Sequence, residues 1–237
     1  MNDCPPAALV GAHRAVQQAA KTVLSALASR IRATDTEASL AADAHRELTG
    51  LGYPETWYYA CPALVLAGAR SCLSVSGRDY VPDQVPIGNF NLVTIDLSPL
   101  HQGIWGDCAR SFYVENGRAV PSPQVPEWRR GQAFLSTLHD AMRRMIRPDM
   151  SFHELFEWTG EKLREGGLEN LDQRGNVGHS IASRRDSRRY VEAGNHGKLG
   201  DVPFFTFEPH VREQGGRWGF KHEDIFYFDQ HGHLQAL

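Results

Sequence analysis

IRATDTEASLAADAHRELTGLG, residues 31–52, and IRPDMSFHELFEWTGEKLREGG, residues 146–167, come into register when the sequence is shifted by 115 residues (31 to 146). In this register Ile31 meets Ile146, and Thr36 meets Ser151. Each stretch has a capping residue, an amphipathic run and a glycine stop, which is typical of a helix. The correspondence predicts two similar halves, each with helices packed on one sheet. The alternative is that any two amphipathic helix pairs share such a pattern.

The hydrophobic pattern outside these stretches predicts further helices and several strands. Helices are expected at residues 7–31, 36–50 and 127–146, and in a stretch with a capping box that begins at Ser151. Strands are expected at residues 63–67, 71–76, 91–98, 108–114, 204–208, 223–228 and 233–236. The order of helices followed by strands, given twice, predicts an α+β fold.

Composition excludes several classes of protein. The chain has 237 residues, of which 41% are hydrophobic, enough for a substantial core, and we take residues 1–237 as a single domain. A net charge of -3 gives no general attraction to nucleic acid or to an anionic membrane. No apolar run reaches transmembrane length, and the N-terminus lacks the pattern of a signal peptide. The four scattered cysteines favour reduced thiols and a cytoplasmic location.

Acidic residues interrupt the predicted strands. Asp96 lies within the apolar stretch VTIDLSP, and Asp107 follows eleven residues later, after what looks like a turn. Further along come His179, Glu208 and Glu223. Four carboxylates gathered in one core would repel each other, and two divalent ions would compensate them. Oxygen ligands with one imidazole suit manganese, iron, cobalt or zinc.

Each of these residues also has a simpler explanation. A lone aspartate in a strand can bond to a turn, a glutamate before proline can end an exposed strand, and a histidine after glycine is often on the surface. Their joint order favours the metal hypothesis. We therefore expect a metal ion, rather than a lysine or arginine, to neutralise Asp96.

Five motifs carry a resemblance to a known family: IDLSP, GDCARSF, VGHSIA, FTFEPHV and KHEDIFYF, in that order. Over roughly residues 10–237 the sequence resembles the catalytic domain of the superfamily of methionine aminopeptidase, Xaa-Pro aminopeptidase, prolidase and creatinase. The resemblance implies the pita-bread fold. In that fold two pseudo-symmetric halves, each with two helices and strands, surround a curved and mainly antiparallel sheet.

The resemblance also implies a role for each of the five residues. Asp96 would bind the first metal ion, Asp107 and Glu223 would bridge both ions, and His179 and Glu208 would complete the shell of the second. A hydroxide bridging the two ions would be the nucleophile, and Glu208 would move a proton from it to the leaving group.

Two neighbours of these residues have supporting roles by the same resemblance. Arg110 lies where a basic residue often follows the second aspartate, and it would steady a ligand carboxylate, although a surface salt bridge is the alternative. Asp224 would orient the segment that carries Glu223.

The sequence departs from the family pattern at two histidines that bind substrate in relatives. The region 74–86 contains no histidine, and Arg78, Asp79 and Tyr80 are its polar candidates for the pocket. No second histidine follows in SIASRRDSRRYVEAGN, residues 180–195, where four arginines cluster.

The arginine cluster predicts a different way of holding substrate. Its guanidinium groups could bind a substrate carboxylate or phosphate, or the cluster could be a solvated loop. Arg188 and Tyr190 are the candidates for substrate binding in this segment, and His210 is a candidate at the rim of the site.

These observations favour a metal-dependent hydrolase that cleaves an amide C–N bond in a small peptide or a similar molecule. The motif EPHV resembles the Xaa-Pro peptidase branch more than methionine aminopeptidase. A first alternative is a creatinase-like enzyme that acts on a small metabolite, and a second is a binding scaffold without catalysis. A homodimer is possible because dimers are common in the family.

Overall fold

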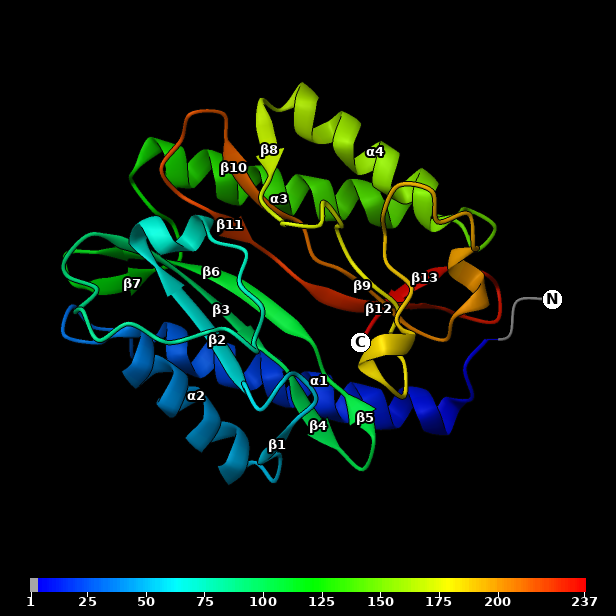
Figure 1. The fold of residues 1–237 in the computed structure, drawn as a ribbon, viewed down its shortest axis with the longest axis horizontal. Coiled ribbons are helices and arrows are strands. Elements are labelled where there is room, and N and C mark those ends of the chain that lie inside the picture. The colour runs from blue at the N-terminus through cyan, green and yellow to red at the C-terminus, as the bar shows by residue number, and fades with distance from the viewer. Residues whose placement is uncertain (1–3) are drawn as a thin grey trace.

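Two helix pairs lie on opposite sides of a set of antiparallel strands in the computed structural model, which describes residues 4–237. The first pair is α1 (Ala7–Ala28) and α2 (Glu37–Gly50), and the second is α3 (Pro126–Met145) and α4 (Phe152–Glu165). Figure 1 shows the first pair along the lower edge and the second along the upper edge. Within residues 4–237 no helix is both long and apolar enough to cross a bilayer.

The internal repeat is confirmed by α2 and α4, whose bounds differ by the same 115 residues at both ends (37 to 152 and 50 to 165). Both helices begin with a capping box. The Thr36 hydroxyl accepts from the backbone N–H of Ser39, and the Ser151 hydroxyl accepts from that of Glu154. The side chains of Ser39 and Glu154 accept from the capping residues in return. The two halves therefore start this helix by the same local chemistry.

The first half contains a four-stranded antiparallel sheet of order β2-β3-β6-β7. Its strands are β2 (Ala63–Ala67), β3 (Asn91–Leu97), β6 (Cys108–Glu115) and β7 (Arg118–Val120). The turn between β3 and β6 carries the short strands β4 (Pro99–His101) and β5 (Ile104–Trp105), and β4 also pairs with β1 (Glu55–Thr56). Since β3 and β6 are direct neighbours, the ends of both strands lie together at one edge of this sheet.

The second half contains two three-stranded antiparallel sheets. One has the order β11-β10-β8 and the other β13-β12-β9. The strands are β8 (Leu168–Asn170), β9 (Phe205–Phe207), β10 (His210–Glu213), β11 (Phe220–Lys221), β12 (Asp224–Phe228) and β13 (Leu234–Ala236). All pairings between strands of residues 4–237 are antiparallel, as the pita-bread prediction requires.

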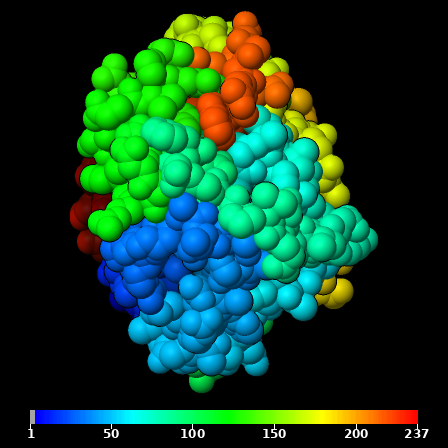
Figure 2. Space-filling model, turned by 90° about the vertical axis from the view of Figure 1, so that its left-hand side faces the viewer, coloured from blue at the N-terminus to red at the C-terminus, as the bar shows by residue number. Residues whose placement is uncertain are grey.

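The two halves join where β6 runs beside the β11–β12 segment. The backbone N–H of Glu223 donates to the carbonyl of Ala109 at 3.0 Å, and the Ser111 hydroxyl bonds to the backbone of Lys221. A second joint connects the turn η1 (Gly68–Cys72) to the connection between β10 and β11. In Figure 2 the connection (orange) lies beside η1 (cyan). Backbone and side-chain hydrogen bonds therefore connect the separate sheets of the two halves.

Each helix pair covers its own apolar cluster. The fully buried side chains include Leu40, Leu48, Val65 and Ile95 in the first half, and Phe152, Leu155, Phe207 and Phe226 in the second. Each of them contributes about 1.5–3 kcal/mol to folding. The second cluster also takes in Leu92 of β3 and Tyr113 of β6, so apolar packing ties the two halves together.

The predicted strand at residues 71–76 is wrong. Residues 68–72 form the 3-10 turn η1, and residues 73–76 have no regular structure. Ser71 explains the difference, because its hydroxyl donates to the carbonyl of Gly68 at 2.6 Å and closes a turn. The other predicted strands match β2, β3, β6, β9, β12 and β13 within two residues at each end.

Candidate metal centre

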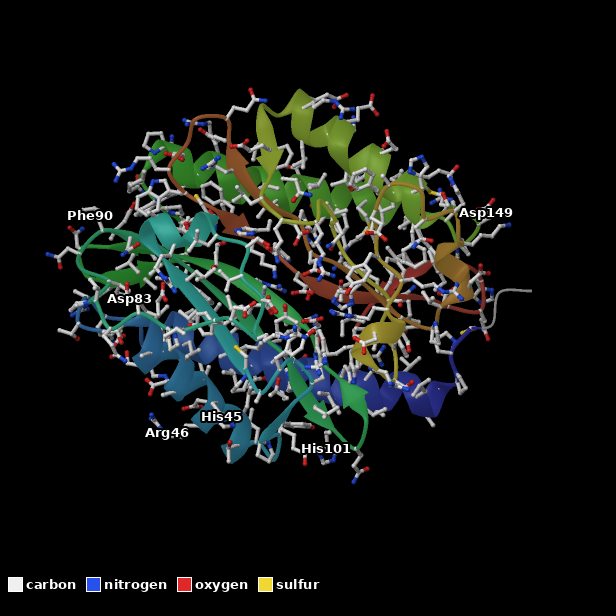
Figure 3. All side chains as sticks on the ribbon, viewed as in Figure 1. His45, Arg46, Asp83, Phe90, His101 and Asp149 are labelled. Carbon is white, nitrogen blue, oxygen red and sulfur yellow. The ribbon has the colours of Figure 1, made fainter. Side chains whose placement is uncertain are left out.

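The five residues that the sequence singled out meet at the joint between the halves. Asp96 lies in β3 and Asp107 directly before β6, while Glu223 precedes β12. His179 and Glu208 come from loops on either side of β9, where backbone bonds from Thr206 to His179 (2.7 Å) and from Glu208 to Val177 (2.9 Å) align them. Residues labelled at the edge of the molecule in Figure 3, such as His101, lie away from this joint.

Three of these residues present ligand atoms to a common point. Asp107, His179 and Glu223 each offer one atom, and these atoms all lie within 4.8 Å of one another. The Nε2 atom of His179 lies 3.4 Å from Oδ2 of Asp107 and 3.7 Å from Oε1 of Glu208. Its other nitrogen, Nδ1, lies 3.1 Å from the carbonyl of Ser180, which can only accept. With Nδ1 facing this carbonyl, Nε2 is the ring nitrogen that faces the two carboxylates.

Buried oxygens at this point lack hydrogen-bond partners. Asp107 is 3% exposed and Glu223 is 0% exposed. Within residues 4–237, Oδ2 of Asp107 and both carboxylate oxygens of Glu223 accept no hydrogen bond. Buried carboxylates are normally paired or bound to a cation. Three oxygens and one imidazole lone pair, all acceptors, therefore fit divalent metal ions.

Burial and charge repulsion raise the pKa values of two of these carboxylates, Asp107 and Glu223. Burial raises the pKa of Asp107 to about 6, although His179 nearby lowers it. Burial, together with the charges of Asp107 and Glu208, also holds the pKa of Glu223 well above its ordinary value. Without more positive charge, part of this cluster would keep its protons near neutral pH.

Lys221 is a member of the site that the sequence analysis missed. Its Nζ lies 2.5 Å from Asp96, 3.4 Å from Glu208 and 3.8 Å from Glu223. The expectation that no lysine or arginine neutralises Asp96 is therefore wrong. Burial alone would lower the pKa of Lys221, but the charges of Asp96, Glu223 and Glu208 outweigh it and hold the pKa well above the usual range. One ammonium offsets only one of the four carboxylates.

A second missed residue, Gln17 of α1, holds the backbone of Asp107. Its amide donates to the Asp107 carbonyl at 2.7 Å and accepts from the Asp107 N–H at 2.8 Å. Gln17 is 0% exposed. A fully buried amide must satisfy both of its ends, so this pair fixes Asp107 relative to α1. A glutamine among the apolar positions of helix 7–31 was the available signal.

Arg110 and Asp224 brace the strand behind Glu223, but Arg110 does so through Asp224 and the Glu223 backbone rather than by steadying a ligand carboxylate. The Arg110 guanidinium donates to both Asp224 oxygens at 3.0 and 2.9 Å and to the carbonyl of Glu223 at 2.5 Å. Lys21 of α1 also pairs with Asp224 at 3.2 Å. Burial would raise the pKa of Asp224, but a bond from His222 and the two cations outweigh it and lower the pKa strongly.

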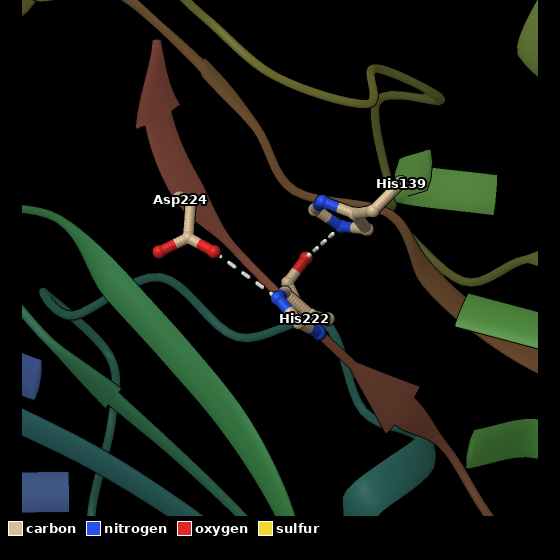
Figure 4. Close-up of side chains that lie close together, drawn as sticks. All are labelled: His139, His222 and Asp224. Atoms are coloured by element: carbon tan, nitrogen blue, oxygen red, sulfur yellow. Dashed lines mark hydrogen bonds and ion pairs between the residues drawn. The ribbon is translucent and has the colours of Figure 1, made fainter. Parts of the chain in front are cut away.

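His139, His222 and Asp224 form a second group of ligand-type side chains (Figure 4). His139 Nε2 lies 3.1 Å from the His222 carbonyl, and His222 Nε2 lies 3.1 Å from an Asp224 oxygen. Because Asp224 already carries Arg110 and Lys21, a further cation there would meet two positive charges. This group is best explained as a brace that ties α3 to the strand of Glu223.

A pocket of about 360 Å³ opens onto the metal centre. Of the predicted substrate-binding residues, Arg78, Arg188, Tyr190 and His210 line it. His210 bonds through Nε2 to the carbonyl of Ser71 at 2.7 Å, and burial lowers its pKa to about 4, so it is a neutral wall residue.

Asp79 and Tyr80 are not among the residues that line the pocket, which corrects their predicted role. The Tyr80 hydroxyl is occupied instead, because it donates to the Val65 carbonyl at 2.8 Å and accepts from the Val65 N–H at 3.1 Å. Tyr80 therefore secures the edge of β2.

Comparison with known proteins identifies the family of this chain. The sequence pattern of metallopeptidase family M24 matches residues 11–230. The chain belongs to metallopeptidase family M24. The match spans all five residues of the site, from Asp96 to Glu223. The α+β pita-bread fold predicted from the sequence is thereby confirmed, and the candidate metal centre lies where the two halves of an M24 domain meet.

Individual M24 relatives differ widely from this chain in sequence. A methionine aminopeptidase of Chlamydia muridarum is 26% identical over an alignment of 147 residues that covers 59% of this chain and 46% of that protein. An X-Pro aminopeptidase from Thermotoga maritima superposes with a TM-score of 0.81 at 15% identity, covering 100% of this chain and 62% of that one. A prolidase from Pyrococcus furiosus gives 0.78 at 17% identity, covering 99% and 65%. The chain thus spans about half to two thirds of these relatives.

The stabilisation of this M24 chain by divalent metal ions is expected to depend on pH. Because the folded-state pKa values of Asp107 and Glu223 lie above their unfolded values, the metal-free protein loses stability as pH rises from about 4 through about 6. Divalent ions compete with those protons. The rise in Tm on adding Mn²⁺ should therefore be larger at about pH 7.5 than at about pH 5.5. Differential scanning fluorimetry measures this, with KCl of equal ionic strength as the control, and an equal rise at both pH values would contradict it.

Proposed function

We propose that the chain is a metal-dependent hydrolase that cleaves an amide C–N bond in a small peptide or a peptide-like molecule. The observation that carries this proposal is the set of buried oxygens of Asp107 and Glu223, which have no hydrogen-bond partner within residues 4–237 and lie beside the Nε2 atom of His179. Buried carboxylates that face one another are stabilised either by protons or by cations, and divalent ions would supply the positive charge that the site lacks. We take residues 1–237 as one catalytic domain.

Two divalent ions would be held by the five side chains. The side chains that would hold them are those of Asp107, His179, Glu208 and Glu223, together with Asp96, which shares its charge with Lys221. When bound, such ions polarise a substrate carbonyl and lower the pKa of water. The ligand set accepts manganese, iron, cobalt or zinc, and manganese is our choice for a first test.

Glu208 is the residue best placed to move a proton. Its side chain is 17% exposed and lines the pocket, unlike that of Glu223, which is fully buried. Burial would raise the pKa of Glu208, but the charges of Lys221, His179 and Arg188 outweigh it and lower the pKa. The ionised carboxylate would take a proton from water and deliver it to the leaving nitrogen.

The substrate proposal favours dipeptides and tripeptides of the Xaa-Pro type. Support comes from the EPHV motif and from the fold shared with an X-Pro aminopeptidase and a prolidase. A pocket of about 360 Å³ is of a size for a small molecule. A creatinase-like reaction on a small metabolite is the second candidate, because arginines follow His179 where relatives carry another histidine.

A screen of short peptides tests the proposal. The protein is loaded with Mn²⁺ and incubated with Xaa-Pro dipeptides and tripeptides, and with the same peptides carrying alanine in place of proline. We expect cleavage that Glu208→Gln abolishes, whereas the exposed Glu165→Gln leaves it unchanged. No cleavage of any peptide by metal-loaded protein would exclude a peptidase and favour the metabolite reaction. No metal and a stable partner in a pull-down would favour the binding scaffold.

Location and assembly stay predictions. The four cysteines are all free thiols, as a reducing compartment would leave them, which supports a cytoplasmic location. A homodimer remains a prediction that sedimentation can test.

A further inference from the structure

An arginine lies in the wall of the pocket between two aromatic rings. The Cζ atom of Arg188 is 5.2 Å from the centre of the Trp57 ring and 5.2 Å from that of Tyr190. Both rings also contact His179, at centroid distances of 5.8 and 6.1 Å. The Nε of Arg188 donates to the carbonyl of Arg185 at 3.0 Å. The guanidinium is therefore held in place beside a candidate metal ligand.

The Arg188 guanidinium has no counter-ion among residues 4–237. None of its nitrogens lies within 4.0 Å of a carboxylate oxygen. Its side chain is half-buried, and its charge reaches the metal centre, where it helps to lower the pKa of Glu208. This half-buried guanidinium is held in place by packing and has no carboxylate partner. It can donate two parallel hydrogen bonds to an oxyanion.

Two more arginines lie against the ring of Tyr59, which lines the same pocket. The ring of Tyr59 has the Cζ of Arg185 at 3.8 Å and that of Arg78 at 4.8 Å. Neither of these arginines forms an ion pair within residues 4–237. Tyr59 and Ala60 adopt backbone φ angles of 51° and 57°, which residues other than glycine rarely adopt. Such strain is often kept where it places a side chain for binding.

We propose that the substrate carries an oxyanion, a carboxylate or a phosphate, that Arg188 binds inside the pocket, while Arg78 and Arg185, beside Tyr59, attract it. This inference rests on the proposed function and names its substrate class. Since Arg188 and the metal ligands line the same pocket, the anionic group must lie near the bond that is cleaved. A free carboxylate on the residue after that bond satisfies this requirement, and a neutral amide does not.

Paired substrates test the proposal directly. The Mn²⁺-loaded enzyme is assayed on an Xaa-Pro dipeptide and on its C-terminal amide. Arg188→Gln should raise KM for the acid at least about tenfold and change KM for the amide little, because only the acid loses a bidentate partner. The KM of Arg188→Lys for the acid should lie between that of the wild type and that of Arg188→Gln. The matched control is Arg189→Gln, an exposed neighbour that does not line the pocket. An equal effect of Arg188→Gln on acid and amide would overturn the proposal.

A binding measurement separates this inference from the proposed function. Isothermal titration uses the Mn²⁺-loaded protein and three probes that contain no bond to cleave: proline as the acid, its amide and inorganic phosphate. Arg188→Gln should weaken binding of the acid or phosphate about tenfold and leave that of the amide unchanged. If no peptide is cleaved but this loss occurs, the anion site stands and the peptidase proposal fails. If neither acid nor phosphate responds to Arg188→Gln, the anion site is excluded.

Discussion

Glu223→Gln is expected to reduce hydrolysis by about a thousandfold or more and to remove tight binding of divalent ions. Glu223 is fully buried, and both of its oxygens lack a hydrogen-bond partner within residues 4–237. An amide keeps the shape of the side chain but removes the charge that a cation needs. Metal content by mass spectrometry and peptide cleavage are measured on the same samples.

The metal-free Glu223→Gln protein should be at least as stable as the metal-free wild type. Burial holds the pKa of Glu223 well above its ordinary value, so the folded protein gains nothing from the charged form. Loss of activity could then not be assigned to unfolding. Glu165→Gln, on the exposed end of α4, is the matched control. Unchanged metal binding in Glu223→Gln would contradict the assignment of this residue.

Gly178→Ala is expected to cost about 3 kcal/mol of folding stability, which corresponds to a Tm lower by about 10 °C. A Cβ at Gly178 would lie 2.3 Å from the carbonyl oxygen of Thr206 and 3.3 Å from a methyl group of Val191. The neighbouring backbone cannot yield easily, because His179 and Thr206 hold each other with two hydrogen bonds of 3.0 and 2.7 Å. Thermal unfolding of the purified variant measures the loss.

The same substitution should weaken metal binding, because moving the backbone at Gly178 displaces His179. Gly11→Ala in α1 is the control, since a Cβ there has no neighbour within 4 Å and alanine favours a helix. That control should keep or slightly raise the Tm. A Gly178→Ala protein with wild-type Tm and metal affinity would show that the close approach does not constrain the site.

Local patterns were sufficient to predict the elements that repeat. The helices α2 and α4 begin at Thr36 and Ser151 because capping boxes act within four residues of sequence. The strand expected at residues 71–76 failed for a local reason, the turn closed by the Ser71 hydroxyl. The short strands β8, β10 and β11 were missed because they are only two to four residues long.

Contacts between the halves could not be predicted from residue spacing. Lys221 stands two residues before Glu223 in KHED, yet its partner Asp96 is 125 residues away. Tyr80 looked like a pocket residue because it is polar and near the site in sequence. Its hydroxyl is instead hydrogen-bonded to the backbone of Val65 in β2. Gln17 was overlooked because its role depends on Asp107, which folds against α1 from 90 residues away. Tertiary pairing decided each of these positions.

The most direct test of the metal centre is the metal content of the wild-type protein, purified without chelator and dialysed against Mn²⁺. Five ligand-type side chains and the unpartnered oxygens of Asp107 and Glu223 predict close to two divalent ions per chain. Substitution of Asp107 by asparagine should remove most of this metal. No bound metal in the wild type after this treatment would contradict the account and leave the buried carboxylates without their counter-ions.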